Sequence, residues 1–279
     1  MDLRAPSASG LHPVEVVRVG AGGRSRAGDV AAVEEPLEIR LHGSPFVVTM
    51  RTPGADPALA AGFLLSERLI TRAEDVGAIR HCTAPGAGAG GNVLDVTLAG
   101  PARDRVEAAL AERRLVTATS ACGVCGRRSI DDLMRDVGRI EASWSIPSAT
   151  LAALPDRLRA AQAVFDETGG LHAAGLFDRH GGLVAAAEDV GRHNAVDKAI
   201  GSQLLAERFP LTDRVLCVSG RTSFEIVQKA VVAGMPIVAA VSAPSSLAIA
   251  LARTANLTLV GFVRGGTFNI YAGGARIGT

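Results

Sequence analysis

The stretch "RVLCVSGRTSFEIVQKAVVAGMPIVAAVSAPSSLAIALARTANLTLVGFVRGG", residues 214–266, decides the fold. Short apolar runs alternate in it with segments of helical periodicity. Continuous apolar strands that alternate with helices are typical of a parallel sheet with helices on both faces. The sequence therefore predicts an α/β fold with a buried parallel sheet in this half of the chain.

Part of this stretch, residues 231–252, contains no charged residue and is long enough to cross a bilayer. However, "AGMP" and "SAPSS" interrupt it, and both are chain-reversal signals. We therefore interpret it as strands and helices of the sheet and expect no membrane association.

The whole chain divides into three parts on composition and pattern. Residues 1–28 are rich in Ala, Gly, Ser and Arg without the apolar run of a secretory signal, which predicts a flexible tail and a cytoplasmic protein. Residues 29–146 predict a smaller α+β region, with a hairpin signal at "HGSP" (42–45). Residues 147–279 form the α/β domain.

Bulk composition excludes several classes of protein. The chain has 279 residues, 48% of them hydrophobic and 20% charged, as in folded globular proteins. Its net charge of +1 comes without a sustained basic stripe, so we expect no nucleic-acid partner. Four cysteines in a cytosolic protein argue against a disulfide framework.

Ligands of open α/β sheets bind outside the carboxyl ends of the strands. Those ends read "SGRTS" (219–223), "SAPSS" (242–246) and "VRGG" (263–266). Their backbone amides and the helices that follow the first two favour anionic groups such as phosphates, as do Arg221 and Arg264. Ordinary turns and helix caps would explain the serines equally well.

The segment "EDVGRHNAVDK" (188–198) packs many different polar side chains into the junction between a strand and a helix. Such a junction is either a capped, solvated helix end or part of a site. The variety of side-chain types favours a site.

Cys122 and Cys125 form a CxxC pair among glycines, ahead of Arg127 and Arg128. A structural zinc site needs four ligands, and no second pair follows at the usual spacing. A thioredoxin-like dithiol is a second interpretation. The third is a persulfide carrier, because the arginines and the helix start at Ser129 would stabilise a reactive thiolate. The residues alone leave all three open.

Several motifs together resemble the FdhD family of formate dehydrogenase accessory sulfurtransferases. The likeness extends from about Glu34 to Tyr271 and rests on "EEPLEIRLHG", "AGFLLSE", "TSACGVCG", "LHAAGLFD", "EDVGRHNAVDKAIG", "SGRTSFEIVQKA" and "GFVRGGTFNIY". A CxxC of this form beside "DVGRHNAVDK" is a specific combination.

The resemblance implies a sulfur carrier that acts as a sulfurtransferase. A cysteine desulfurase would load the loop, and the sulfur would pass to the molybdenum bis-guanine dinucleotide cofactor that formate dehydrogenase requires. This cofactor would be cargo, with no tightly bound metal besides. Cys122 would carry the persulfide and Cys125 would be its partner. The family also implies a homodimer.

The cofactor-binding stretch of the family maps onto Phe262 to Thr267, at the end of the last strand of the predicted sheet. A basic residue is expected where Thr267 stands, which puts that phosphate contact in doubt. With the neighbouring loops, the expected cofactor-binding residues are Phe262, Val263, Arg264, Gly265, Gly266, Thr267, Arg192, His193, Ser219, Arg221 and Thr222.

The resemblance also implies a fold, a three-layer α/β domain similar to cytidine deaminase and preceded by the smaller α+β domain. Zinc deaminases need H-x-E and P-C-x-x-C. The corresponding places here read "HNA" and "SGRTS", so the deaminase chemistry is not expected. The alternative function is a dithiol oxidoreductase or redox chaperone that uses the same cysteine pair.

Overall fold

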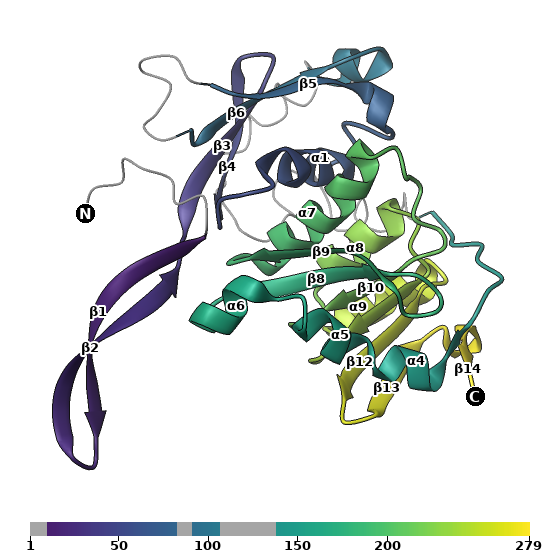
Figure 1. The fold of residues 1–279 in the computed structure, drawn as a ribbon. Coiled ribbons are helices and arrows are strands. Elements are labelled where there is room, and N and C mark those ends of the chain that lie inside the picture. The colour runs from purple at the N-terminus through teal and green to yellow at the C-terminus, as the bar shows by residue number, and fades with distance from the viewer. Residues whose placement is uncertain (1–9, 83–90, 107–137) are drawn as a thin grey trace.

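A computed structural model describes residues 10–82, 91–106 and 138–279 (Figure 1). Cys122 and Cys125, together with Arg127, Arg128 and Ser129, lie outside the described residues. The largest sheet among the described residues has six strands in the order β13-β12-β11-β10-β8-β9. Its strands are β8 (His172–Phe177), β9 (Leu183–Asp189), β10 (Val215–Val218), β11 (Ile237–Ala240), β12 (Thr258–Arg264) and β13 (Thr267–Ala272).

Helices cover both faces of this sheet, as the sequence predicts. One face packs against α7 (Arg192–Leu205), α8 (Phe224–Val232) and α9 (Ser246–Thr254), and the other packs against α4 (Ser148–Ala152) and α5 (Leu154–Arg159). The short helix α6 (Ala163–Thr168) follows α5. Cys217 lies in the core on the α5 side, where burial raises the pKa of its thiol to about 12.

The expectation of parallel strands in residues 214–266 is confirmed, and the strands outside this stretch make the sheet mixed. Strands β10, β11 and β12 are parallel, whereas β8 runs antiparallel to β10 and β13 runs antiparallel to β12. A short turn connects β12 to β13, and a strand reached through a hairpin turn must reverse. β8 forms a hairpin with β9, and the crossover from β9 through α7 to β10 leaves β8 antiparallel to β10.

A second, four-stranded sheet has the order β4-β3-β6-β5. Its strands are β3 (Glu35–Leu41), β4 (Ser44–Arg51), β5 (Val76–His81) and β6 (Val93–Leu98); the 3₁₀ turn η1 (Ala73–Asp75) precedes β5. Helix α1 (Asp56–Ser66) lies between this sheet and α7, and one hydrophobic core runs through all three. The core thus crosses the division that the sequence suggests at residue 146.

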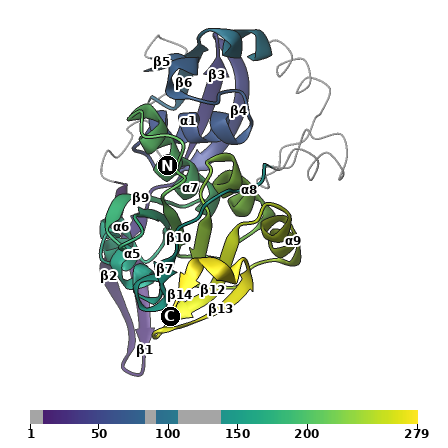
Figure 2. The same ribbon diagram turned by 90° about the vertical axis from the view of Figure 1, so that its right-hand side faces the viewer.

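The expected flexible tail is wrong for residues 11–28. Strands β1 (Leu11–Gly20) and β2 (Gly23–Ala32) pair over their full length and extend away from the rest of the protein (Figure 2). Because most side chains of this hairpin are exposed, it lacks the alternation of apolar and polar residues that reveals a half-buried strand. The hairpin is formed by backbone pairing between its two strands, which a tight turn containing glycine connects.

The short strand β14 (Ile277–Gly278) follows the 3₁₀ turn η2 (Gly274–Arg276) and pairs with β7 (Ile146–Pro147). Among the described residues, no helix combines the length and the apolar character needed to cross a membrane.

Helices α1 and α7 approach each other so closely that only glycine fits at the contact. A Cβ on Gly62 would lie 2.0 Å from the carbonyl oxygen of Asp197, and one on Gly201 would lie 1.9 Å from that of Ala58. Both obstacles are backbone atoms, which cannot move aside alone. The contact fixes where the amino-terminal turn of α7 lies.

We predict that Gly201→Ala lowers the free energy of unfolding by about 3 kcal/mol or more, because the new methyl group forces the two helices apart. Urea unfolding of the full-length protein measures this. The control is Gly22→Ala, where no atom lies within 4 Å of the added Cβ and the change should stay within about 0.5 kcal/mol. Equal stability of the two variants would refute the close contact.

Candidate functional site

The loops that follow the three parallel strands meet at one edge of the large sheet. The Thr222 amide donates to the carbonyl oxygen of Ala243 at 3.2 Å, and the Ser245 amide donates to that of Thr222 at 2.9 Å. The Phe262 amide donates to the carbonyl oxygen of Ser242 at 3.2 Å. Main-chain bonds thus join "SGRTS", "SAPSS" and the end of β12, as their position in a parallel sheet predicts.

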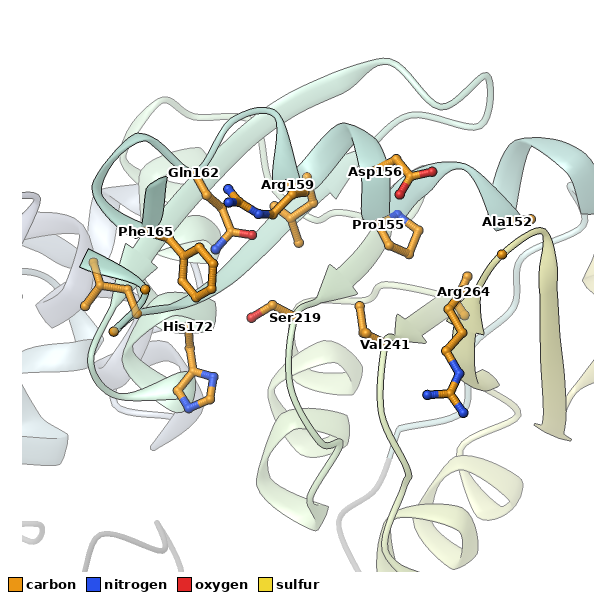
Figure 3. A pocket seen from close by; sticks show the side chains of 16 residues that line it. Ala152, Pro155, Asp156, Arg159, Gln162, Phe165, His172, Ser219, Val241 and Arg264 are labelled. Atoms are coloured by element: carbon orange, nitrogen blue, oxygen red, sulfur yellow. The ribbon is translucent and has the colours of Figure 1, made fainter. Parts of the chain in front are cut away.

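A cavity of about 640 Å³ opens beside this edge, between the strand ends and helices α5 and α6 (Figure 3). Four expected residues line it: Ser219, Val263, Arg264 and Gly265. The rest of the lining comes from segments that the sequence did not suggest: Arg159, Gln162 and Phe165 lie on the opposite wall, and His172 lies beside the end of β10. The lining combines apolar surface with cationic groups.

Arg159 is held in place on the cavity wall. Its guanidinium lies 4.6 Å from the centre of the Phe165 ring and pairs with the carboxylate of Asp166. Arg264 stands across the cavity from it, with its guanidinium 5.8 Å from the ring centre of Phe262. Two guanidinium groups on opposite walls favour a ligand that carries negative charge.

His172 is a cavity residue that the sequence analysis missed. Because β8 runs antiparallel to β10, its first residue lies beside the end of β10, next to the ligand-binding edge. The ring lies so close to Gly220 that a Cβ there would be 3.3 Å from Nδ1. Burial lowers the pKa of His172, and the charges of Arg192 and Arg221 lower it further. The lowered pKa favours the neutral imidazole.

The model of the FdhD/NarQ family matches residues 32–278 of this sequence. "Sulfur carrier protein FdhD" of Anaeromyxobacter dehalogenans strain 2CP-C is 53% identical over 256 residues, which cover 90% of this chain and 89% of that protein. The Streptomyces avermitilis protein of the same name is 51% identical over 274 residues, 94% of each chain. The chain belongs to the FdhD/NarQ family.

A solved structure agrees with this assignment. The crystal structure described as a formate dehydrogenase accessory protein from Desulfotalea psychrophila matches with a TM-score of 0.75 at 25% identity. The match covers 96% of this chain and 99% of that one. The fold is therefore shared over almost the full length.

The stretch expected to bind the cofactor in the FdhD/NarQ family is a tight β-hairpin. Gly265 and Gly266 form its turn, both with positive φ (56° and 76°), and the Thr267 hydroxyl donates to the carbonyl oxygen of Arg264 at 3.1 Å. Phe262 also has a positive φ of 56°, at an irregularity in the pairing of β12 with β13. Of this stretch, Val263, Arg264 and Gly265 reach the cavity, whereas Phe262, Gly266 and Thr267 do not line it.

Arg192, His193, Arg221 and Thr222 do not line the cavity either. His193 instead contacts the first turn of α8, with Nε2 2.9 Å from the Ser223 hydroxyl. Arg221 is exposed and Thr222 is buried between the loops. The structure therefore divides the expected residues between the cavity and the side of the sheet that α7 and α8 cover.

Most polar side chains of the "EDVGRHNAVDK" segment have structural partners. Lys198 Nζ lies 2.7 Å from an Asp189 carboxylate oxygen and donates to the Thr52 carbonyl oxygen at 2.7 Å. Asn194 donates to the Met50 carbonyl oxygen at 2.7 Å. These bonds join α7 and β9 to the end of β4. Many of the polar side chains that suggested a ligand site therefore hold secondary-structure elements together instead.

The residue before Lys198 in α7, Asp197, forms a second buried ion pair. Both oxygens of the Asp197 carboxylate accept from Lys229 Nζ at 2.9 Å, and Ser66 donates to one of them at 3.1 Å. Burial raises the pKa of Asp197 to about 6, although Lys229 acts in the opposite direction. This pair connects α7 to α8 and α1.

We predict that Lys198→Met lowers the free energy of unfolding by about 3–5 kcal/mol, because the fully buried Asp189 carboxylate loses its cation. Urea unfolding measures the loss. Arg18→Met is the matched control, since its pair with Asp29 is 4.0 Å long and solvent-exposed, and its removal should cost less than about 1 kcal/mol. A similar small effect for both would mean that Lys198 does not hold the segment.

Proposed function

We propose that the protein is a sulfur carrier that delivers persulfide sulfur to the molybdenum bis-guanine dinucleotide cofactor of formate dehydrogenase. The support that carries this proposal is its membership in the FdhD/NarQ family, with relatives called sulfur carrier proteins at about half identity over nearly the whole chain. The name of the structural relative, a formate dehydrogenase accessory protein, supports the same client.

In the proposed loading step, the Cys122 thiolate attacks the outer sulfur of a persulfide on a cysteine desulfurase. A sulfur–sulfur bond forms to Cys122, the bond within the donor persulfide breaks, and the desulfurase cysteine leaves as a thiolate. Thiolate attack of this kind is the general mechanism of exchange at sulfur–sulfur bonds.

In the proposed release step, the Cys125 thiolate attacks the inner sulfur on Cys122. A disulfide forms between the two cysteines, and the outer sulfur leaves as hydrosulfide for the cofactor. The cysteine pair supplies the two electrons, and a dithiol reductant restores it. The reaction is a sulfurtransferase cycle.

The cavity at the strand ends is the proposed binding place of this cargo. Its volume of about 640 Å³ lies within the range of roughly 300–1,000 Å³ typical of small-molecule sites. Arg264 and Arg159 would bind phosphate oxygens, His172 would gain a proton beside them, and the apolar walls would contact the base. A homodimer would present two such cavities to a cofactor with two guanine dinucleotide halves.

The loading step predicts that incubation with a cysteine desulfurase and cysteine adds one sulfur atom to the peptide that contains Cys122, removable by reductant. Mass spectrometry of the digested protein measures this, and Cys122→Ala should abolish the addition. Cys217→Ala is the control, because that thiol is fully buried. If the protein only loses two hydrogens between Cys122 and Cys125, it is a dithiol oxidoreductase or redox chaperone instead.

The cargo site predicts that guanosine diphosphate, one half of the cofactor's nucleotide part, binds in the cavity. Arg264→Ala should weaken binding by about 10- to 100-fold through the loss of one charge-assisted phosphate contact. Isothermal titration calorimetry measures it, with Arg139→Ala as the control, a 70% exposed arginine that does not line the cavity. Equal affinities of the two variants would exclude Arg264 from the site.

A further inference from the structure

Ser223 occupies a position where serine normally caps a helix, but its hydroxyl has another partner. It is the N-cap residue of α8, with φ −88° and ψ 171°, and its side chain makes no capping hydrogen bond. The neighbouring helix α9 has Ser245 at the same position, where the hydroxyl accepts from the Ala248 amide at 3.2 Å. Since such a cap contributes about 1 kcal/mol, the different orientation at Ser223 calls for another interaction.

That interaction is with His193, in the first turn of α7. The Ser223 hydroxyl lies 2.9 Å from His193 Nε2, and His193 Nδ1 lies 3.3 Å from Glu225 Oε2 on the opposite side of the ring. The carboxylate therefore favours the proton on Nδ1, which leaves the Nε2 lone pair to accept the Ser223 proton. The 3.3 Å contact acts through charge and not through a hydrogen bond, because Glu225 Oε2 has no hydrogen-bond partner among the described residues. Contacts of this kind in free enzymes often tighten when substrate binds.

Glu225 is supported as an anion by a buried lysine. Its other oxygen lies 3.3 Å from Lys229 Nζ, which the Asp197 carboxylate also holds. Burial raises the pKa of Glu225, and the charge of Lys229 opposes that rise. A serine, a histidine and an oriented carboxylate in this order are the arrangement that activates a nucleophilic hydroxyl.

The surroundings of Ser223 suit a ligand with negative charge. Ser223 and His193 are only half-buried, so both can be reached from solvent. Beside them, Arg192 Nε and Thr222 Oγ1 are buried without a hydrogen-bond partner among the residues that the structure describes. The amides of the first turn of α8 and its positive dipole would stabilise an oxyanion close to the hydroxyl.

We propose that Ser223 is a nucleophile activated by His193 and Glu225, and that it hydrolyses carboxylic esters with an anionic acyl group. Its oxygen attacks the ester carbonyl while its proton passes to His193 Nε2. The carbon–oxygen bond to the alcohol then breaks, and His193 gives the proton to the departing alkoxide. Water, deprotonated by His193, attacks the acyl-serine, and the carboxylate leaves as Ser223 regains its proton.

The full-length protein is treated with a fluorophosphonate, which reacts with activated serines, and the digest is mapped by mass spectrometry. An adduct on Ser223 and none on Ser245 is the expected result. His193→Ala should lower the rate of labelling about 100-fold or more, the range for loss of a general base. Ser202→Ala is the control, since its hydroxyl bonds within α7, where it donates to the Ala199 carbonyl oxygen and accepts from Gln203 Nε2.

The pH dependence of labelling separates a catalytic role from a purely structural one. The rate should fall as the pH is lowered, because a protonated imidazole cannot accept the Ser223 proton. Glu225→Gln should slow labelling at constant pH, which keeps the test valid if His193→Ala does not fold. The proposal is overturned if Ser223 in the wild-type protein carries no adduct, or if its rate is independent of both pH and Glu225. Sulfur loading on Cys122 is a separate measurement, so the two proposals fail independently.

Discussion

The contact between helices α1 and α7 is the constraint on which the rest of the structure depends. Gly62 and Gly201 let the two backbones touch, so a single added methyl group has no space at either position. Because α7 cannot shift, its first turn stays at the edge of the large sheet, where the strand-end loops meet. The smaller sheet is attached to the larger one through the same pair of helices and one continuous core.

Two buried ion pairs fix the register of α7 against its neighbours. Asp189 with Lys198 and Asp197 with Lys229 are all at most 3% exposed, and such pairs contribute little net stability over well-packed apolar residues. What they provide is specificity, because each carboxylate accepts its lysine in only one register of α7 against β9, β4 and α8. Slippage of α7 by one turn would leave two carboxylates and two ammonium groups unpaired.

The sequence predicts what local pattern determines and misses what tertiary pairing determines. The apolar strands at 215–218, 237–240 and 258–264 and the meeting of their loops follow from strand–helix alternation. The pairing of β8 with β10 does not follow from local pattern, and His172 was missed because that pairing places it beside the end of β10. The β1–β2 hairpin was missed because its side chains are mostly exposed. The polarity of residues 188–198 indicated a ligand site, but much of it holds elements together.

At the edge where the strand-end loops meet, the two faces of the large sheet have different chemical environments. On the α5 side, the cavity has guanidinium groups at its walls, which suits recognition of a charged ligand. On the α7–α8 side, Ser223, His193 and Glu225 are fixed by two helix starts and a buried lysine, which suits proton transfer between atoms held at constant distance. Residues 219–223 belong to both, since Ser219 lines the cavity and Ser223 begins α8. This one loop therefore connects the cavity to the first turn of α8.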